Sequence, residues 1–310
     1  MPSSRKQRVT DDWATHWSGF AAVGLSALLF GTLAIFGKYA QQEHLTIATL
    51  LGLRFLIAAV VLWAIVGVRR ELRWPGMRRV AQLGFLSILF VGQSACYFLS
   101  LRTAPAAVTS ILLYIYPVVV TMLGWLLYRE RLSVRSGVSL VVATCGVALV
   151  IGITPSGHLD TAGIVFGVGA GLLYSLYIVI GERVLHATSA LFTMAAVSSG
   201  AAATFLVFGA VTRSLAAFDA VGWVTVLGAA LLPTVVGATL FLFGVARVGP
   251  TRASILSTVE PVATGSLAAI LLAERLSPLR ILGGAAVLGA ASLVASGRRA
   301  PLSRATQVAP

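Results

Sequence analysis

The chain has 310 residues, of which 58% are hydrophobic and only 11% charged, and its mean hydropathy is +0.93. A soluble domain carries about 25% charged residues, so this composition excludes a water-soluble globular protein and predicts a protein embedded in a lipid bilayer. The formal net charge of +13 is also found in nucleic-acid-binding proteins. Here the basic residues stand in short clusters between apolar runs, so we predict no nucleic-acid partner.

Ten apolar runs have about the length that a membrane helix needs, roughly 20 residues. In chain order they are Ser18–Tyr39, Thr46–Val68, Val80–Leu101, Pro105–Leu127, Val134–Ile153, Ala162–Leu185, Ala190–Val211, Val221–Ala246, Pro250–Ala273 and Pro278–Ala295. The connections between them are too short to hold a soluble domain. The predicted fold class is therefore an all-α membrane protein with ten transmembrane helices.

The basic residues fall into two unequal groups along this path. With the segment 1–17 placed in the cytoplasm, 17 basic residues lie in cytoplasmic segments and 5 on the opposite side, while Arg54 lies within the second helix. The positive-inside rule therefore places both the segment 1–17 and the tail 297–310 in the cytoplasm. We predict a multi-pass protein of the cell inner membrane.

The sequence also matches itself at a shift of about 144 residues. The matched segments are Ser110–Leu112 with Ser254–Leu256, Pro117 with Pro261, and Glu130–Ser133 with Glu274–Ser277. Each copy holds five helices, and this odd number forces the second copy to enter the membrane from the opposite side. We therefore expect two inverted repeats, 18–153 and 162–296, around a central cavity, as in many secondary transporters.

A family resemblance rests on these repeated segments and on two pieces of the first helices, Phe30-Gly31 and Leu53-Arg54-Phe55. The most specific pieces are Tyr116-Pro117 through Trp125 and the second copy that starts at Glu260-Pro261. Over essentially its whole length the chain resembles the EamA-type, ten-helix members of the drug/metabolite transporter superfamily. The resemblance implies two five-helix bundles that move metabolites, and the chain looks most like amino-acid exporters, including the aromatic-amino-acid exporter branch.

Glu260 is the outstanding candidate for a site residue. It lies near the middle of the ninth helix, where a charge costs about 3 kcal/mol on insertion scales. Its counterpart in the first repeat is Tyr116, so the repeat does not impose the acid. We interpret Glu260 as a cavity carboxylate that binds a substrate ammonium group or carries a proton. A neutral glutamic acid bonded to a neighbouring helix is the structural alternative.

Three further residues interrupt the apolar character of their helices. Pro117 and Pro261 have no N–H, so we expect both to bend their helices and to line the cavity; packing kinks are the alternative. Arg54 has three interpretations: it pairs with a carboxylate, binds the carboxylate of an amino acid, or anchors helix packing.

Polar and aromatic side chains inside the spans give a further set of cavity candidates. They are Gln93, Tyr97, Tyr116 and Tyr177. Such side chains can line a pocket for a zwitterion with an apolar tail, although hydrogen bonding between helices explains any one of them equally well.

No histidine or cysteine pair has metal-ligand spacing, and no phosphate-binding loop occurs. We therefore predict no catalytic residue, no metal and no cofactor. The predicted function is a secondary transporter, not an enzyme, that exports amino acids or related small metabolites by alternating access, as a monomer in the lipid bilayer. The alternatives are export of cationic drugs or nucleotide sugars in the same fold, a passive channel, and a membrane-embedded enzyme.

Overall fold

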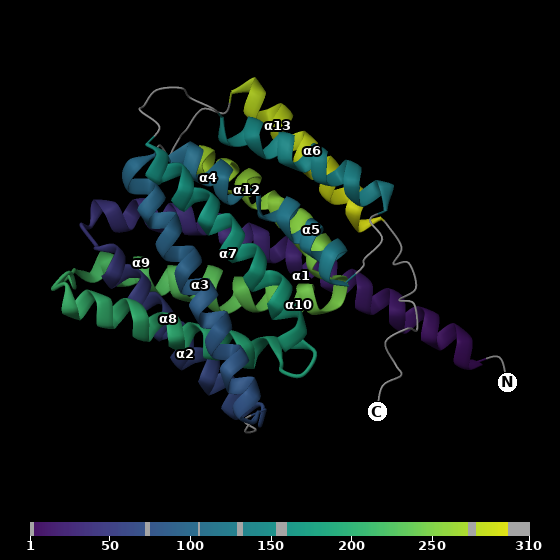
Figure 1. Ribbon diagram of the computed structural model, residues 1–310, viewed down its shortest axis with the longest axis horizontal. Helices are drawn as coiled ribbons and strands as arrows, with labels where there is room; N and C mark the ends of the chain where they lie inside the picture. Colours follow the sequence, from purple (N-terminus) through teal and green to yellow (C-terminus); the bar gives the residue numbers. More distant parts are fainter. Residues whose placement is uncertain are drawn as a thin grey trace.

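The computed structural model describes residues 3–71, 75–104, 106–128, 133–152, 160–271 and 277–296. Within these ranges the chain is helical, with short turns between the helices and no strand. Ten helical spans are long and apolar enough to cross a membrane (Figure 1). This confirms the predicted all-α fold with ten transmembrane helices.

The helices are α1 (Ser3–Gln42), α2 (Ile47–Val68), α3 (Met77–Thr103), α4 (Ala106–Leu113), α5 (Tyr116–Tyr128), α6 (Val134–Ile151), α7 (Thr161–Leu185), α8 (Ala190–Val211), α9 (Ala220–Ala229), α10 (Thr239–Val248), α11 (Pro250–Leu256), α12 (Glu260–Leu271) and α13 (Pro278–Ala295). A π-helical segment, η1 (Ala230–Ala238), joins α9 to α10, and a 3-10 turn, η2 (Ser257–Val259), joins α11 to α12. Three of the ten spans are therefore composite.

The two helices that carry the repeated prolines are interrupted, where the sequence predicts a single bent helix. α4 ends at Leu113 and α5 begins at Tyr116; likewise, α11 ends at Leu256 and α12 begins at Glu260. The physical reason is that each proline takes the second position of a new helix, where no N–H is needed. The break therefore occurs at equivalent places in both repeats.

Hydroxyl caps start equivalent helices in both halves. Thr46 and Ser189 cap α2 and α8, and Ser133 and Ser277 cap α6 and α13, each by accepting a hydrogen bond from a backbone N–H in the first turn. Such a cap contributes about 1 kcal/mol. Ser133 and Ser277 close the repeated Glu-Arg-Leu-Ser motif, whose other residues lie outside the described ranges.

The two halves are interlocked, because helices of the first half pack against helices of the second. α2 packs on α8, α3 on α7, and α6 on α13. The α6–α13 pair runs along one edge of the bundle (Figure 1). It is joined by close backbone contact: a Cβ atom on Gly283 would lie 2.7 Å from the carbonyl oxygen of Gly146. Only glycine allows these two backbones to approach so closely.

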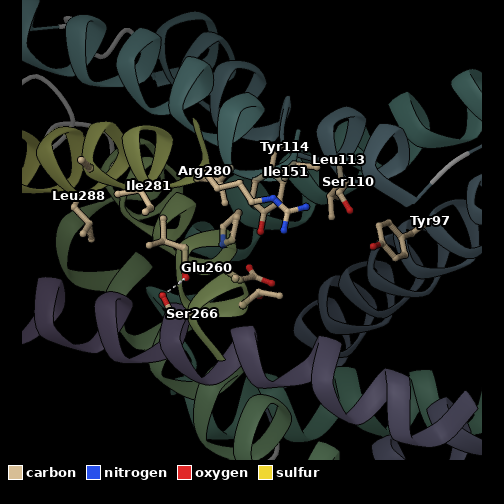
Figure 2. Close-up of a pocket in the computed structure, with 17 residues that line it drawn as sticks. Tyr97, Ser110, Leu113, Tyr114, Ile151, Glu260, Ser266, Arg280, Ile281 and Leu288 are labelled. Atoms are coloured by element: carbon tan, nitrogen blue, oxygen red, sulfur yellow. Dashed lines mark hydrogen bonds between the residues drawn. The ribbon is translucent and has the colours of Figure 1, made fainter. Parts of the chain in front are cut away.

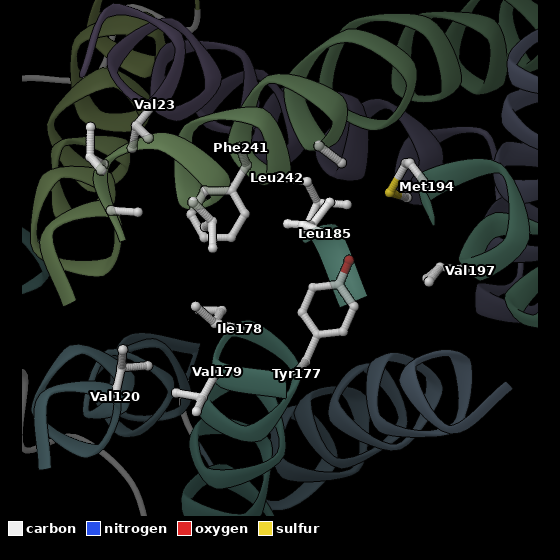
Figure 3. Packing of buried hydrophobic residues seen from close by; sticks show 14 of the residues in the cluster. Val23, Val120, Tyr177, Ile178, Val179, Leu185, Met194, Val197, Phe241 and Leu242 are labelled. Carbon is white, nitrogen blue, oxygen red and sulfur yellow. The ribbon is translucent and has the colours of Figure 1, made fainter. Parts of the chain in front are cut away.

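The bundle has two faces, because successive spans alternate in direction. We call the face where α1 begins and α13 ends the terminal face, and the face where α6 ends and α13 begins the distal face. Most of the large buried cluster lies toward the terminal face, with Val66, Val120, Val184 and Val248 fully or almost fully buried. Figure 3 shows Val120, Tyr177, Ile178, Val179, Phe241 and Leu242 within this cluster. The terminal half is thus closely packed.

Candidate functional site

A cavity of about 550 Å³ lies in the distal half of the bundle. Its walls come from the end of α3, from α4, from the end of α6, and from the beginnings of α12 and α13 (Figure 2). All these segments lie in the half next to the distal face, because α3 and α6 end there and α4 and α13 begin there. The distal half of the bundle therefore contains the cavity, whereas the terminal half is closely packed.

Glu260 lines this cavity and is the first residue of α12. Glu260 directly follows the 3-10 turn η2, its backbone N–H donates to the Ser257 carbonyl, and the next residue, Pro261, has no N–H. The Tyr114 side chain lies beside the Glu260 carboxyl group and interacts with it. The chain thus places an acid inside a membrane bundle, beside the side chain of Tyr114.

Two more polar side chains share the cavity with Glu260 and Tyr114. Tyr97 from α3 interacts with Ser110 from α4, and both residues line the cavity. Figure 2 shows them on the side away from the α13 residues Ile281 and Leu288. Hydroxyl groups of this kind both donate and accept hydrogen bonds, so they suit a ligand that carries both kinds of partner.

Arg280, in the first turn of α13, also lines the cavity, and the sequence analysis assigned it no role there. Its position close to a helix end makes it look like an ordinary residue of the membrane surface. One signal was available: its counterpart at the shift of 144 residues is Ser136, so the repeat imposes no arginine here. The same shift of 144 residues pairs Glu260 with Tyr116, so the repeat does not impose the acid either.

Apart from Thr264 and Ser266, whose hydroxyls donate to backbone carbonyls, the remaining wall of the cavity is apolar. It includes Leu113, Val150, Ile151, Ile281 and Leu288. Ile281 and Leu288 are also exposed on the outside of α13, which places this wall next to the lipid-facing surface. The cavity is therefore amphipathic, with charged and hydroxyl groups at one part and aliphatic side chains at another.

Tyr116 and Tyr177, both predicted cavity residues, are not part of the lining and are each only 2% exposed. The hydroxyl of Tyr116 lies 2.5 Å from the hydroxyl of Ser257. The Ser254 carbonyl can accept from the Ser257 hydroxyl at 3.0 Å and from the Tyr116 hydroxyl at 3.5 Å, so either hydroxyl can be the donor between the two. Tyr177 stacks on Tyr174 with ring centroids 6.1 Å apart. These tyrosines belong to the packed layer on the terminal side of the cavity.

Three other predicted residues also lie outside the lining. Arg54 is buried in α2; its guanidinium stacks on the adjacent Phe55 ring at 4.3 Å, and its Nε has no hydrogen-bond partner. Gln93 accepts a hydrogen bond from Ser94 on its own helix. Pro117 lies in the first turn of α5, whereas Pro261, its counterpart, lines the cavity. The structure thus brings Glu260, Tyr97 and Pro261 together and separates the others from them.

Comparisons with known proteins agree with this architecture. Residues 17–152 and 161–296 each match the EamA-like transporter family. An uncharacterized transporter of Archaeoglobus fulgidus is 30% identical over 274 residues, which are 87% of this chain and 93% of that protein. The threonine/homoserine exporter RhtA of Escherichia coli K12 is 27% identical over 245 residues, 77% of each chain.

The fold itself is shared with a crystal structure that is 19% identical in sequence. The TM-score is 0.77, and the likeness covers 91% of this chain and 97% of that one. Two matched halves in the sequence, ten spans and this shared fold all agree. The chain therefore belongs to the EamA-like transporter family, which consists of membrane transporters rather than enzymes.

Proposed function

We propose that this transporter exports amino acids or related small metabolites by alternating access. The observation that carries the proposal is the carboxyl group of Glu260 at the start of α12, inside an amphipathic cavity between the two halves. A carboxylate at that position binds the ammonium group of an amino acid, and the aliphatic wall accepts its side chain. The cavity volume of about 550 Å³ leaves room for such a solute and some water.

The named relative supports this substrate class. RhtA, a threonine/homoserine exporter, aligns with 77% of this chain. Its two named substrates are α-amino acids, and each carries one ammonium and one carboxylate group. We extend this class to the present chain because its cavity has an acid for the ammonium group.

Orientation and mechanism follow from the asymmetry between the two faces. We place the terminal face in the cytoplasm of the inner membrane, because 17 basic residues fall on that side and 5 on the other. The cavity then lies in the outer half of the membrane. The bond between Tyr116 of one half and Ser257 of the other is part of the packed layer on the cytoplasmic side of the cavity. Export requires this contact to open while the distal cavity closes.

Counterflow into proteoliposomes tests the proposal. Vesicles are preloaded with one unlabelled solute, and uptake of labelled threonine, methionine or phenylalanine is followed, with a quaternary ammonium and a nucleotide sugar as comparison solutes. We expect saturable uptake of an amino acid that is stimulated by the same solute inside. Movement of the ammonium or sugar nucleotide alone would refute the amino-acid assignment and leave the family membership intact.

A further inference from the structure

We infer that Arg280 binds the carboxylate group of the substrate, so that the cavity selects zwitterions over simple amines. The inference rests on the proposed function and adds a second charged contact to it. Arg280 comes from α13 and Glu260 from α12, and both line the same cavity. Figure 2 shows the Arg280 side chain extending from α13 toward the middle of this space.

The position of Arg280 is not explained by the stability of its own helix. It is the third residue of α13, and a cation near a helix N-terminus meets the positive end of the dipole. The equivalent residue of α6 is Ser136, and the arginine in the first turn of that helix, Arg135, is exposed, donates to the Ser296 carbonyl and does not line the cavity. Both helices therefore carry an arginine in the first turn, and what distinguishes Arg280 is that it lines the cavity.

Arg280 and Glu260 line one cavity and carry opposite charges, and in the part of the chain that the structure describes no ion pair joins them. A direct pair would neutralise both groups and fill the space between them. With the two charges separated, an α-amino acid can satisfy both groups at once, its ammonium on Glu260 and its carboxylate on Arg280. The planar guanidinium binds a carboxylate through two parallel hydrogen bonds, which favours arginine for this role.

Arg54 is the other arginine considered as a ligand for the substrate carboxylate, but it does not lie in the cavity. Its guanidinium stacks on Phe55 and it is not part of the cavity lining. Arg280 therefore takes the carboxylate contact that the sequence analysis gave as one interpretation of Arg54. The aliphatic wall around Ile281 and Leu288 then faces the substrate side chain.

The test compares matched pairs of solutes with and without a carboxylate. The labelled solute is whichever of threonine, methionine or phenylalanine the wild-type protein moves. The competitor is either the same unlabelled amino acid or the amine formed by loss of its carboxylate. We expect the wild-type protein to bind the amino acid roughly 10- to 100-fold more tightly than the amine, the factor of one charge-assisted contact.

In Arg280→Gln, we expect the apparent affinity for the amino acid to fall by roughly 10- to 100-fold while that for the amine stays unchanged, so that the preference disappears. Arg280→Lys, which keeps the charge but loses the double contact, should lie between the two. Ligand-induced thermal stabilisation of the detergent-purified variants gives the same comparison without transport, and it also reports whether each variant is folded.

Arg135→Gln is the matched control. Arg135 occupies the start of α6, is exposed and donates to the Ser296 carbonyl, so its loss should leave the preference intact. An Arg280→Gln protein that still prefers the amino acid overturns the inference, as does one in which both solutes weaken equally. If the wild-type protein moves no amino acid at all, the proposed function itself fails, which is a separate result.

Discussion

The two copies of the interrupted helix have the same backbone design and different surroundings. α4 and α5 meet at Tyr116-Pro117, and α11 and α12 meet at Glu260-Pro261. Because the repeats are inverted, α4 and α12 lie in the distal half, while α5 and α11 lie in the terminal half. The distal members line the cavity, and the terminal members form part of the packed layer.

The contrast is visible in a single repeated motif. Ser110 in α4 lines the cavity, whereas its counterpart Ser254 in α11 is fully buried. Likewise Glu260 lines the cavity, and its counterpart Tyr116 is hydrogen-bonded to Ser257 across the two halves. Exchange of these two environments would move the cavity to the terminal face. In the alternating-access mechanism proposed above, the inverted repeat would supply the geometry of both end states.

The largest expected effect comes from neutralising the acid at one break. Glu260→Gln keeps the shape of the side chain but removes its charge, so the contact with a substrate ammonium group weakens. We expect the transport efficiency in counterflow to fall by about 10- to 100-fold, the factor of one charge-assisted hydrogen bond. Expression and the melting temperature in detergent should stay close to wild type. Unchanged transport would remove Glu260 from the mechanism.

The sequence predicted the fold well because the signals for it are simple. Ten apolar runs identify ten spans, and the charged and proline-containing segments at a shift of about 144 residues reveal the two halves. Glu260 stood out because an acid in an apolar helix is costly. These inferences need no knowledge of which side chains meet in space.

The lining of the cavity was harder to predict, because it depends on which half is hollow in this conformation. Tyr116 and Tyr177 have the residue type of a cavity wall but lie in the packed half. Arg54 has the charge of a ligand-binding residue, yet it stacks on its neighbour Phe55. Arg280 resembled a surface residue because it lies near a helix end, and only the arrangement of α12 and α13 brings it beside Glu260.

Chemical labelling measures the difference between the two environments. Ser110→Cys and Ser254→Cys are introduced after the native cysteines, Cys96 and Cys145, have been replaced by alanine. In this conformation a small water-soluble thiol reagent should label residue 110 at least about tenfold faster than residue 254, because the second is fully buried. Addition of the transported solute should bring the two rates closer together. Equal rates without solute would contradict the packed terminal half.

The contact between Tyr116 and Ser257 should control that equilibrium. Tyr116→Phe removes the hydroxyl that is hydrogen-bonded to Ser257 across the two halves and leaves the ring in place. A hydrogen bond of this kind contributes about 1 kcal/mol, so the terminal side should open about fivefold more often. We expect faster labelling at residue 254 in the Ser254→Cys background and little change at residue 110. A labelling rate that stays the same would show that packing alone closes this side.

The smallest expected effect comes from a feature in which the two copies are alike. Ser133 and Ser277 cap α6 and α13 in the same way, each accepting a hydrogen bond from the backbone N–H three residues later. Ser133→Ala and Ser277→Ala should each cost about 1 kcal/mol and lower the melting temperature in detergent by about 2 °C. Since Ser277 begins the helix that carries Arg280, its loss should also weaken substrate binding, whereas loss of Ser133 should not. A difference in binding with equal stability would therefore separate the roles of two helices that begin with the same serine cap.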